Sequence, residues 1–404
     1  MSSLLTINMI TREAVRLWKN SNEFIRLVDQ QYDDQYARTG AKIGSALRIR
    51  YPNDFTVRTG PAAQVQDTTE TSTTLVLATQ KGVDVSYSSQ ERTMQLDDFS
   101  RRTLAPMVNN LAGAVAADTM SGVESGISNI QPNLDSGGNL ISPVAQTWLL
   151  AGAQLDINSA PRENRRIIAD PLTMARTVAT LAGLLNPQGS ISRQYESGQM
   201  ADALGFTWFQ DQTVIKHATS AYTAGFTVVG ANQTGLSITT SAITGGLAQG
   251  DIVTFPGANA VNHITKVSTQ TLKQFVVTSA VATGGTSIPI YPALIPAGPG
   301  GVQVQYQTVD NSPTNNGVVN VTTAASLVYR KNFVFAPQAV TLAMADLELP
   351  KGVHEAARES YDGIAMRMVS AYNVQTDQFI TRLDVLYGYL WLRPEWACVV
   401  PDIV

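Results

Sequence analysis

The feature that most constrains this chain is a change of hydrophobic period within residues 83–126. At first, Val and Tyr alternate with Asp and Ser, a period of two that predicts a strand with one buried face. From Asp97 onward, apolar residues recur every three or four positions, which predicts a long helix. Small residues between 112 and 117 allow other segments to approach that helix closely. Pro106 should kink the helix or mark a new start. Such a helix suits close packing against more than one partner, and an ordinary buried helix of a globular domain stays an open alternative.

Charged residues are scarce for a chain of 404 residues, which is long enough for two or three domains. Asp, Glu, Lys and Arg make up 15% of the chain, against about 25% in typical soluble domains. Low charge is typical of interface cores, and also of thread-like extracellular β proteins. The formal net charge of −4 argues against a reader of duplex DNA, because such proteins neutralise phosphates with a basic face.

The sequence carries no signal for export or for membrane insertion. It has no run of about eighteen apolar residues, and its first residues lack the pattern of a secretion signal. Its one cysteine, Cys398, excludes an internal disulfide framework. We therefore expect a soluble product made in the cytoplasm, with no membrane contact.

The N-terminal segment, residues 11–36, predicts a helical arm with a break and a fresh cap at residues 20–23. Large aromatic side chains, including Trp18 and Tyr32, fall on its apolar stripe. A helical arm with such a stripe needs a surface to lie on. That surface is either its own domain or a neighbouring molecule, and the pattern leaves both open.

Residues 46–90 predict a long two-stranded excursion. Leu47 and Ile49 alternate with Arg48 and Arg50, and a polar crossing rich in Thr, Gln and Gly precedes a return strand. Arms of a dozen residues reach roughly 40 Å at about 3.3 Å per residue. Because a lone hairpin is marginally stable in water, we expect this one to lie on another surface, such as another subunit.

The middle of the chain predicts a compact unit followed by a β-rich insertion. A short buried strand at 167–169 leads into Asp170 and Pro171, which are suited to begin a helix. Charges nearly vanish over residues 222–326, where short β runs separated by Gly-rich turns predict a small barrel or sandwich. We expect β runs at residues 226–229, 236–239, 251–255, 264–267, 274–278, 287–290 and 302–309.

No constellation for catalysis or metal binding stands out. His354-Glu355 resembles the start of a zinc-protease helix, but Arg358 stands where the second histidine belongs. The paired residues Arg101 and Arg102 are too short a run for a nucleic-acid patch and suit interface or surface ion pairs. We predict no catalytic residue, no metal site and no cofactor.

The order of elements, together with several local motifs, resembles the major capsid (coat) proteins of tailed bacteriophages, of the Hong Kong 97-like type. It is most similar to the short-tailed Salmonella-phage group, whose coat protein carries an inserted β-barrel domain. The motifs that carry the resemblance are Ala203-Leu204-Gly205-Phe206, Phe333-Val334-Phe335-Ala336-Pro337-Gln338-Ala339-Val340, Ser360-Tyr361-Asp362-Gly363-Ile364, Arg382-Leu383-Asp384-Val385-Leu386-Tyr387-Gly388 and Arg393-Pro394-Glu395.

This resemblance implies an α+β, Hong Kong 97-like phage capsid fold with an inserted all-β barrel domain. The implied segments are 1–40 (N-terminal helical arm), 41–92 (extended β-hairpin), 93–145 (spine helix and peripheral domain), 146–222 (axial domain), 223–328 (inserted β-barrel domain) and 329–404 (return through the axial and peripheral domains).

The implied function is a major capsid protein that self-assembles into the icosahedral head shell enclosing the phage double-stranded DNA. Pentamers and hexamers would form a precursor shell that later expands, with the arm and hairpin as mobile parts. The implied partners are further copies of the chain, a separate scaffolding protein, a portal protein, decoration proteins where these are used, and DNA contacted non-specifically. The protein would be assembled in the host cytoplasm and reside in the virion. We expect no covalent crosslink, because nothing marks an asparagine partner for Lys42 or Lys81.

Two other classes stay open at this point. A virion or cell-surface protein could bind glycans or receptors through its β-rich segment, although residues 222–326 contain no Trp and only three Tyr. An enzyme would need a constellation that the sequence lacks. For the capsid interpretation, the candidate subunit-interface residues are Trp18, Tyr32, Arg48, Arg50, Tyr51, Arg58, Arg101 and Arg102.

Overall fold

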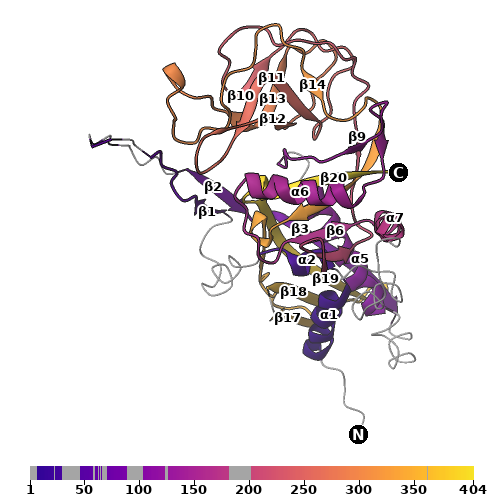
Figure 1. The fold of residues 1–404 in the computed structure, drawn as a ribbon. Helices are drawn as coiled ribbons and strands as arrows, with labels where there is room; N and C mark the ends of the chain where they lie inside the picture. The colour runs from indigo at the N-terminus through magenta and orange to yellow at the C-terminus, as the bar shows by residue number, and fades with distance from the viewer. Residues whose placement is uncertain are drawn as a thin grey trace. The chain divides into compact units, whose positions relative to one another are not determined.

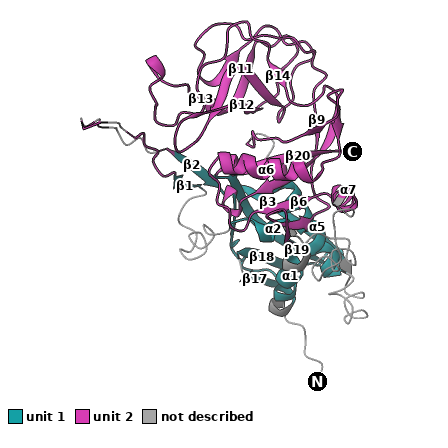
Figure 2. Ribbon diagram, viewed as in Figure 1, with its two compact units in different colours: residues 1–50, 72–119, 340–392 teal, residues 51–71, 120–339, 393–404 magenta. Residues whose placement is uncertain are grey.

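The computed structural model divides the chain into two compact units, and Figure 2 shows them in different colours. Unit 1 comprises residues 1–50, 72–119 and 340–392, and unit 2 comprises residues 51–71, 120–339 and 393–404. The structure describes residues 7–21, 23–29, 46–57, 60–61, 63, 65, 71–88, 103–122, 126–181, 202–361 and 363–404. Helices and strands both contribute, so the architecture is α+β as expected.

Unit 1 is built on an antiparallel sheet whose central strand is β19. One half of β19 pairs with β18 and with β3 on its two edges, and the other half pairs with β16. The strands are β3 (Thr79–Ser88), β16 (Val340–Ala345), β17 (Glu355–Tyr361), β18 (Ile364–Asn373) and β19 (Gln378–Trp391).

The side chains of residues 359–370 alternate as they would in a single strand, but β17 and β18 form a hairpin there, with a turn before Ile364. Alternation alone cannot show the turn, because the chain keeps its period of two on both strands. The Asp362-Gly363 pair was the local signal, since Gly363 has a φ of +76°.

The N-terminal arm consists of α1 (Ile7–Ser21) and α2 (Glu23–Leu27), with the break where the sequence placed it. α1 packs on β17 and β18, and Arg12 forms an ion pair with Glu359 at 3.3 Å. After α2, the backbone N–H of Asp29 donates to the carbonyl of Val340 at 3.1 Å. The described part of the arm therefore lies on the chain's own sheet.

The hairpin is shorter than the sequence suggested. β1 (Ala46–Arg50) and β2 (Ser72–Val76) pair antiparallel in a two-stranded sheet. The return strand continues as β3, however, and β3 pairs with β19 along its whole length. Of the excursion expected over residues 46–90, residues 79–88 therefore lie on the chain's own sheet, because a β-rich strand beside an open sheet edge gains ten residues of pairing there.

The long helix of unit 1, α5 (Ala105–Ser121), begins one residue before Pro106. Proline suits the first turn of a helix because its missing N–H has no intrahelical partner there. Thr103 and Leu104, directly before α5, are π-helical, so Pro106 lies near a change of helix type. Whether it kinks the helix or marks a new start stays a prediction. Asp97 and Asp98 lie outside the described residues. Asp118 of α5 accepts a hydrogen bond from the hydroxyl of Tyr387 at 2.5 Å and pairs with Lys81 at 3.4 Å, which joins the helix to β19 and β3.

Unit 2 contains a six-stranded sheet in the order β20-β15-β6-β8-β7, with β9 beside β15. β6 and β8 are parallel, and the other pairs are antiparallel. The strands are β6 (Arg166–Ala169), β7 (Asp202–Ala203), β8 (Phe206–Gln210), β9 (Lys216–Ala218), β15 (Val328–Phe335) and β20 (Ala397–Ile403), and a small pair, β4 (Asn133–Leu134) and β5 (Leu140–Ile141), precedes them.

Two helices accompany this sheet, α6 (Ala145–Ile157) and α7 (Pro171–Leu181). α6 packs on β15 and β20 (Figure 1). Its Trp148 ring meets that of Trp208 edge to face at 4.9 Å. α7 begins as predicted, with the Asp170 carboxylate accepting a hydrogen bond from the backbone N–H of Leu172 at 2.9 Å.

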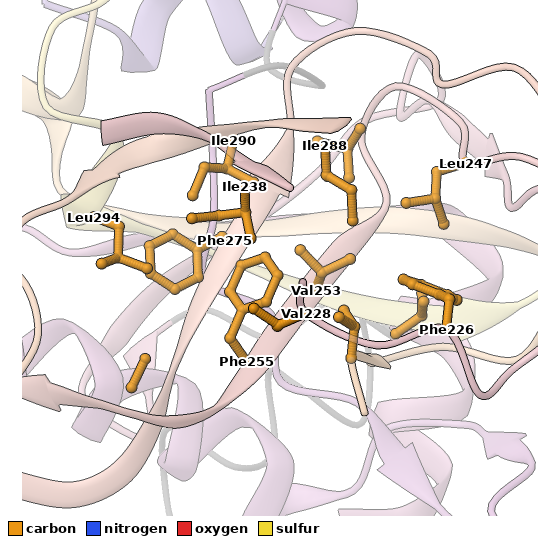
Figure 3. Packing of buried hydrophobic residues seen from close by; sticks show 14 of the residues in the cluster. Phe226, Val228, Ile238, Leu247, Val253, Phe255, Phe275, Ile288, Ile290 and Leu294 are labelled. Atoms are coloured by element: carbon orange, nitrogen blue, oxygen red, sulfur yellow. The ribbon is translucent and has the colours of Figure 1, made fainter. Parts of the chain in front are cut away.

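Residues 223–328 fold as a five-stranded sheet with its own core, and we call this segment the insertion. Figure 3 shows its apolar side chains converging, with the rings of Phe255 and Phe275 5.5 Å apart. Isolated bridges such as Val228 to Thr240 add to the sheet. Its strands, in the order β10-β13-β12-β11-β14, are β10 (Gly235–Thr239), β11 (Ile252–Val261), β12 (Ser268–Val277), β13 (Ser287–Leu294) and β14 (Asn320–Val321).

Four of the seven expected β runs correspond to β10, β11, β12 and β13. The runs at 226–229 and 302–309 form only isolated bridges and turns. Residues 264–267 are the turn between β11 and β12, where Ile264 is 69% exposed. The prediction of a strand at residues 264–267 was wrong, because the apolar side chain of Ile264 does not face the core. Closure into a barrel stays a prediction.

Candidate functional site

The hairpin presents two arginines on one exposed face. Arg48 pairs in register with Thr74, and Arg50 pairs with Ser72, so both arginines project from the same side of β1. Both side chains are exposed, whereas Ile49 between them is buried. The Nε of Arg48 donates to the hydroxyl of Ser72 at 2.8 Å, which steadies one guanidinium without neutralising it.

Tyr51 continues the hairpin beyond β1. Its backbone N–H donates to the carbonyl of Thr71 at 2.9 Å, and its side chain is half-buried. Beyond it, Phe55 is 52% exposed and Val57 is 87% exposed. The described part of the hairpin therefore carries apolar as well as cationic surface.

Trp18 was expected to anchor the arm at a subunit interface, and its role at an interface stays a prediction. Its side chain is 1% exposed within the single chain, in the helix that packs on β17 and β18. Burial of this large apolar ring against the sheet of its own chain stabilises the folded subunit without any contribution from a partner. The other four candidates, Tyr32, Arg58, Arg101 and Arg102, lie outside the described residues.

The structure adds an apolar surface that the sequence interpretation missed. Leu149 and Leu150 of α6 are 51% and 44% exposed, and Leu172 of α7 is 53% exposed. Trp148, one position earlier, is fully buried in the core of unit 2. Helical geometry was the available signal, because a residue next to a buried position points about 100° away from it.

A charge ladder crosses the sheet of unit 1. Asp84 accepts two hydrogen bonds from Arg382, at 2.9 and 3.2 Å, and these bonds are the main reason that the pKa of this carboxyl is lowered. On the next strand pair, the guanidinium of Arg367 donates to Asp384 at 2.7 Å. Asp384 is 3% exposed, so its charge is compensated inside the sheet.

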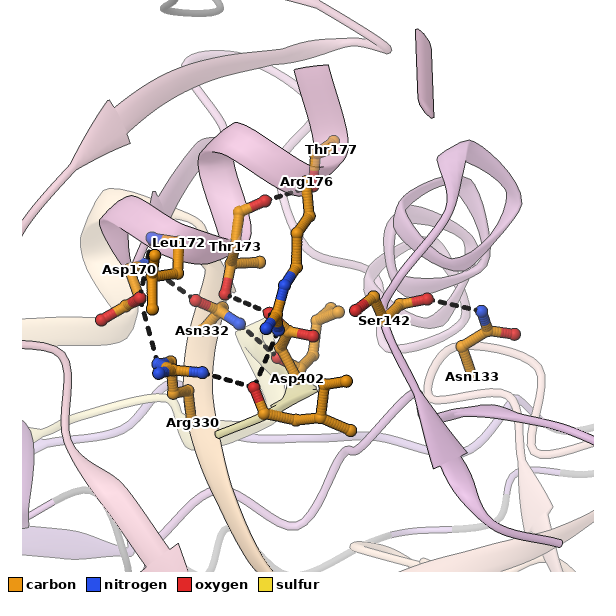
Figure 4. Close-up of polar contacts among 12 residues, drawn as sticks. Asn133, Ser142, Asp170, Leu172, Thr173, Arg176, Thr177, Arg330, Asn332 and Asp402 are labelled. Atoms are coloured by element: carbon orange, nitrogen blue, oxygen red, sulfur yellow. Dashed lines mark hydrogen bonds and ion pairs between the residues drawn. The ribbon is translucent and has the colours of Figure 1, made fainter. Parts of the chain in front are cut away.

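A second network fixes the C-terminal strand of unit 2 (Figure 4). Asp402 is fully buried and accepts hydrogen bonds from the Thr173 hydroxyl at 2.7 Å and from Arg176 at 3.1 Å. The Nε of Arg330 pairs with Asp170 at 3.1 Å, and the Asn332 amide donates to the carbonyl of Val400 at 3.0 Å. β20 is thereby tied to α7 and β15.

Three side chains of types often used in catalysis, His217, His354 and Cys398, have neighbours within the chain. His217 Nε2 lies 2.9 Å from Asp251 Oδ1, and both side chains are buried. His354 stacks at a tilt on Phe379, with ring centroids 5.3 Å apart. Burial raises the pKa of the Cys398 thiol, so the thiolate is disfavoured. Within the described ranges, no group of three or more His, Cys, Asp or Glu side chains could hold a metal ion.

Comparison with known proteins decides the class. The family model described as "P22 coat protein - gene protein 5" matches residues 41–400. The chain belongs to the P22 coat protein family. Its class is therefore that of a major capsid protein forming the icosahedral head shell, which is found in the virion as one of many copies. The predicted α+β capsid fold class is confirmed, and the alternative of a β-rich glycan- or receptor-binding protein is not supported.

Several solved structures are similar to this coat protein. A chain of Mycobacterium phage Che8 has 10% identity and a TM-score of 0.48, with 94% of this chain and 90% of that chain covered. The capsid of the cyanophage P-SCSP1u has 12% identity and a TM-score of 0.42, with 89% and 84% covered. The CUS-3 coat protein I-domain has 26% identity and a TM-score of 0.20, with 24% of this chain and 96% of that chain covered.

Among curated proteins, none matches this coat protein. Of the helices in the described part of the chain, none is long and apolar enough to cross a membrane.

Proposed function

We propose that this coat protein builds its shell through the hairpin, whose arginine face meets a carboxylate-bearing surface of the next subunit. The observation that carries this proposal is the exposure of both Arg48 and Arg50 on one side of β1. Two cations held side by side repel each other weakly in water and favour an acidic partner. We propose subunit contacts for Tyr51 as well, and for Tyr32, Arg58, Arg101 and Arg102.

The exposed leucines of α6 and α7 suit a second subunit contact. Leu149, Leu150 and Leu172 lie in the proposed axial domain, residues 146–222, where copies would meet around the centre of a pentamer or hexamer. Apolar side chains left exposed on a chain that acts in a shell gain most from burial between copies. The other proposed domains keep the boundaries 1–40, 41–92, 93–145, 223–328 and 329–404.

The finer features of assembly follow the family resemblance. We place pentamers and hexamers first in a precursor shell and then in an expanded one around double-stranded DNA, with a separate scaffolding protein and a portal protein. We place the conformational change in the hairpin, because the buried Trp18 keeps the described arm on its own sheet. Assembly would take place in the host cytoplasm, and the insertion would form the barrel of the short-tailed group.

The proposal is tested by charge reversal on the hairpin. The variant Arg48→Glu/Arg50→Glu is expressed with a candidate scaffold and compared by electron microscopy with the wild type and with Lys351→Glu. Lys351 is an exposed residue in a turn of unit 1 and serves as the matched control. We expect closed shells from the wild type and the control, and soluble subunits or capsomers from the hairpin variant. Normal shells from the hairpin variant would remove the arginine face from the mechanism.

A further inference from the structure

The insertion contains very few charges, and their positions are informative. Residues 223–328 include only four side chains from Asp, Glu, Lys and Arg, namely Asp251, Lys266, Lys273 and Asp310. Asp310 is satisfied inside the insertion, where it accepts hydrogen bonds from Asn259 at 2.9 Å and from Ser268 at 2.8 Å. The other three face residues outside it.

These three charges mark where the insertion contacts the rest of unit 2. Asp251 lies 2.9 Å from His217. Burial lowers the pKa of Lys273, and the nearby charge of Glu395 opposes that change. Lys266 forms an ion pair with Asp54, which belongs to the segment that follows β1.

The Lys266 ammonium is held in place by a structured turn. Its side chain is 1% exposed, and its backbone has a φ of +55°. The turn is closed by the backbone N–H of Lys266, which donates to the carbonyl of Asn262 at 2.9 Å. The Asn262 side chain in turn accepts from the N–H groups of Ile264 and Thr265, at 2.9 and 3.0 Å. A buried ammonium fixed in this way needs a carboxylate, because an unpaired buried charge is strongly destabilising.

Asp54 meets the insertion at a second point. Its backbone carbonyl accepts a hydrogen bond from the Gln305 amide at 2.5 Å. The neighbouring Gln303 donates to the carbonyl of Thr265 at 3.0 Å, which joins the loop carrying Gln305 to the turn carrying Lys266. The Asp54 side chain is 17% exposed, so the pair is shielded from solvent on both sides.

We propose that the insertion is a docking site for residues 51–57 of its own chain, with Lys266 and Gln305 as the residues that recognise Asp54. The insertion thus holds the segment that follows β1 in the unassembled subunit, before the hairpin meets a neighbour. The docking does not depend on the proposed hairpin interface, but its consequence for assembly rests on that proposed function. The occupant is fixed by charge complementarity, since the buried Lys266 ammonium faces the carboxylate of Asp54, which is 17% exposed.

Charge exchange in the full-length chain tests the docking. Hydrogen–deuterium exchange of residues 51–57 is measured in dilute, unassembled subunits of the wild type, Asp54→Lys, Lys266→Asp and the double variant. Aspartate tolerates the positive φ at position 266 better than most residues do. We expect each single variant to exchange at least about tenfold faster over residues 51–57, and the double variant to return toward the wild type. Lys351→Asp serves as the control and should leave these residues unchanged.

A third variant keeps the test decisive if a reversal prevents folding. Lys266→Met removes the charge and keeps the aliphatic length, and protection of Cys398 from alkylation reports that unit 2 is folded. We expect fast exchange over residues 51–57 with Cys398 still protected. Unchanged exchange in Lys266→Met and in both single reversals would overturn the proposal.

Mixing the two single variants distinguishes docking within a chain from docking between chains. Docking within one chain predicts that Asp54→Lys and Lys266→Asp subunits stay rapidly exchanging when mixed. Slow exchange restored only in the mixture, or rising with protein concentration, would place the contact between copies and contradict the proposal. Hydrogen–deuterium exchange is measured in unassembled subunits. Failure of the proposed hairpin interface would therefore not change this result.

Discussion

The guanidinium of Arg367 donates a hydrogen bond of 2.7 Å to the carboxylate of Asp384, its register partner across β18 and β19. Arg382 approaches the same carboxylate from its own strand, at 3.6 Å. Asp384 is 3% exposed, so the charge that unit 1 buries in its sheet is held from two sides. This arrangement makes the sheet sensitive to the loss of one partner.

We expect Asp384→Asn to lower the free energy of unfolding by about 3 kcal/mol, because it leaves the Arg367 guanidinium without its buried counter-charge. Urea denaturation followed by circular dichroism measures the change. Asp84→Asn is the matched control: its pair with Arg382 is about half exposed, so its removal should cost less than about 1 kcal/mol. Equal losses from the two variants would show that burial of Asp384 has no special cost.

Gly82 gives this carboxylate its room, and we expect Gly82→Ala to destabilise unit 1. A Cβ at position 82 would lie 2.3 Å from Oδ1 of Asp384 and 2.9 Å from the carbonyl oxygen of Leu383. Overpacking of this kind costs about 1–3 kcal/mol. Gly298→Ala is the comparison, because its nearest neighbour would lie at 3.3 Å. A thermal melt in which the two variants lose equal stability would contradict the close approach at Gly82.

Asp156 should make the stability of unit 2 depend on pH in the acid range. Burial acts to raise the pKa of this carboxyl, but hydrogen bonds from Arg165 and Arg162 outweigh it and lower the pKa. The folded state therefore holds the proton more weakly than the unfolded state, whose pKa is about 3.9. The stabilisation is present above that value and is lost as the pH falls through the lowered pKa.

The measurement compares Asp156→Asn with the wild type in urea titrations from pH 6 downward. We expect the wild type to be more stable at pH 6 and the difference to shrink as the pH falls below about 4. A difference that stays constant over this range would mean that the carboxylate charge does not contribute.

The lone cysteine should report unfolding of unit 2. Cys398 is fully buried in β20, and burial raises the pKa of its thiol, so little reactive thiolate is present. We expect iodoacetamide at pH 8 to label the native subunit far more slowly than the urea-unfolded chain, as followed by mass spectrometry. Equal labelling rates would show that β20 opens freely in the native subunit.

Local chemistry made part of this fold predictable. Asp170 and Pro171 began a helix as expected, because a capping carboxylate and a proline act on their immediate neighbours. Pro106 lies in the first turn of α5, where a proline is tolerated. The break in the arm between α1 and α2 also followed from a few adjacent residues.

The pairing of distant strands could not be read in the same way. Residues 79–88 show the same alternation whether they extend a free hairpin or lie beside β19, so their place in the sheet depends on partners about 300 residues away. The burial of Trp18 likewise depends on β17 and β18. A period of two identifies a strand and a buried face, but it does not identify the surface that buries it.

The candidate site was predictable where it lies on a regular strand. The alternation of Arg48 and Arg50 with Leu47 and Ile49 indicated one charged face, and both arginines are exposed. The Lys266–Asp54 pair had no signal in the sequence, because it joins a turn to a segment 212 residues away. Contacts of this kind depend on how the elements pack.

The most direct test of the account is cryo-electron microscopy of the assembled shell at a resolution that places side chains. We expect the β1 face that carries Arg48 and Arg50 to lie within ion-pair distance, about 4 Å, of Asp or Glu side chains from an adjacent copy. An arginine face that points to solvent in every copy, with the hairpin touching only its own chain, would contradict the proposed mode of assembly.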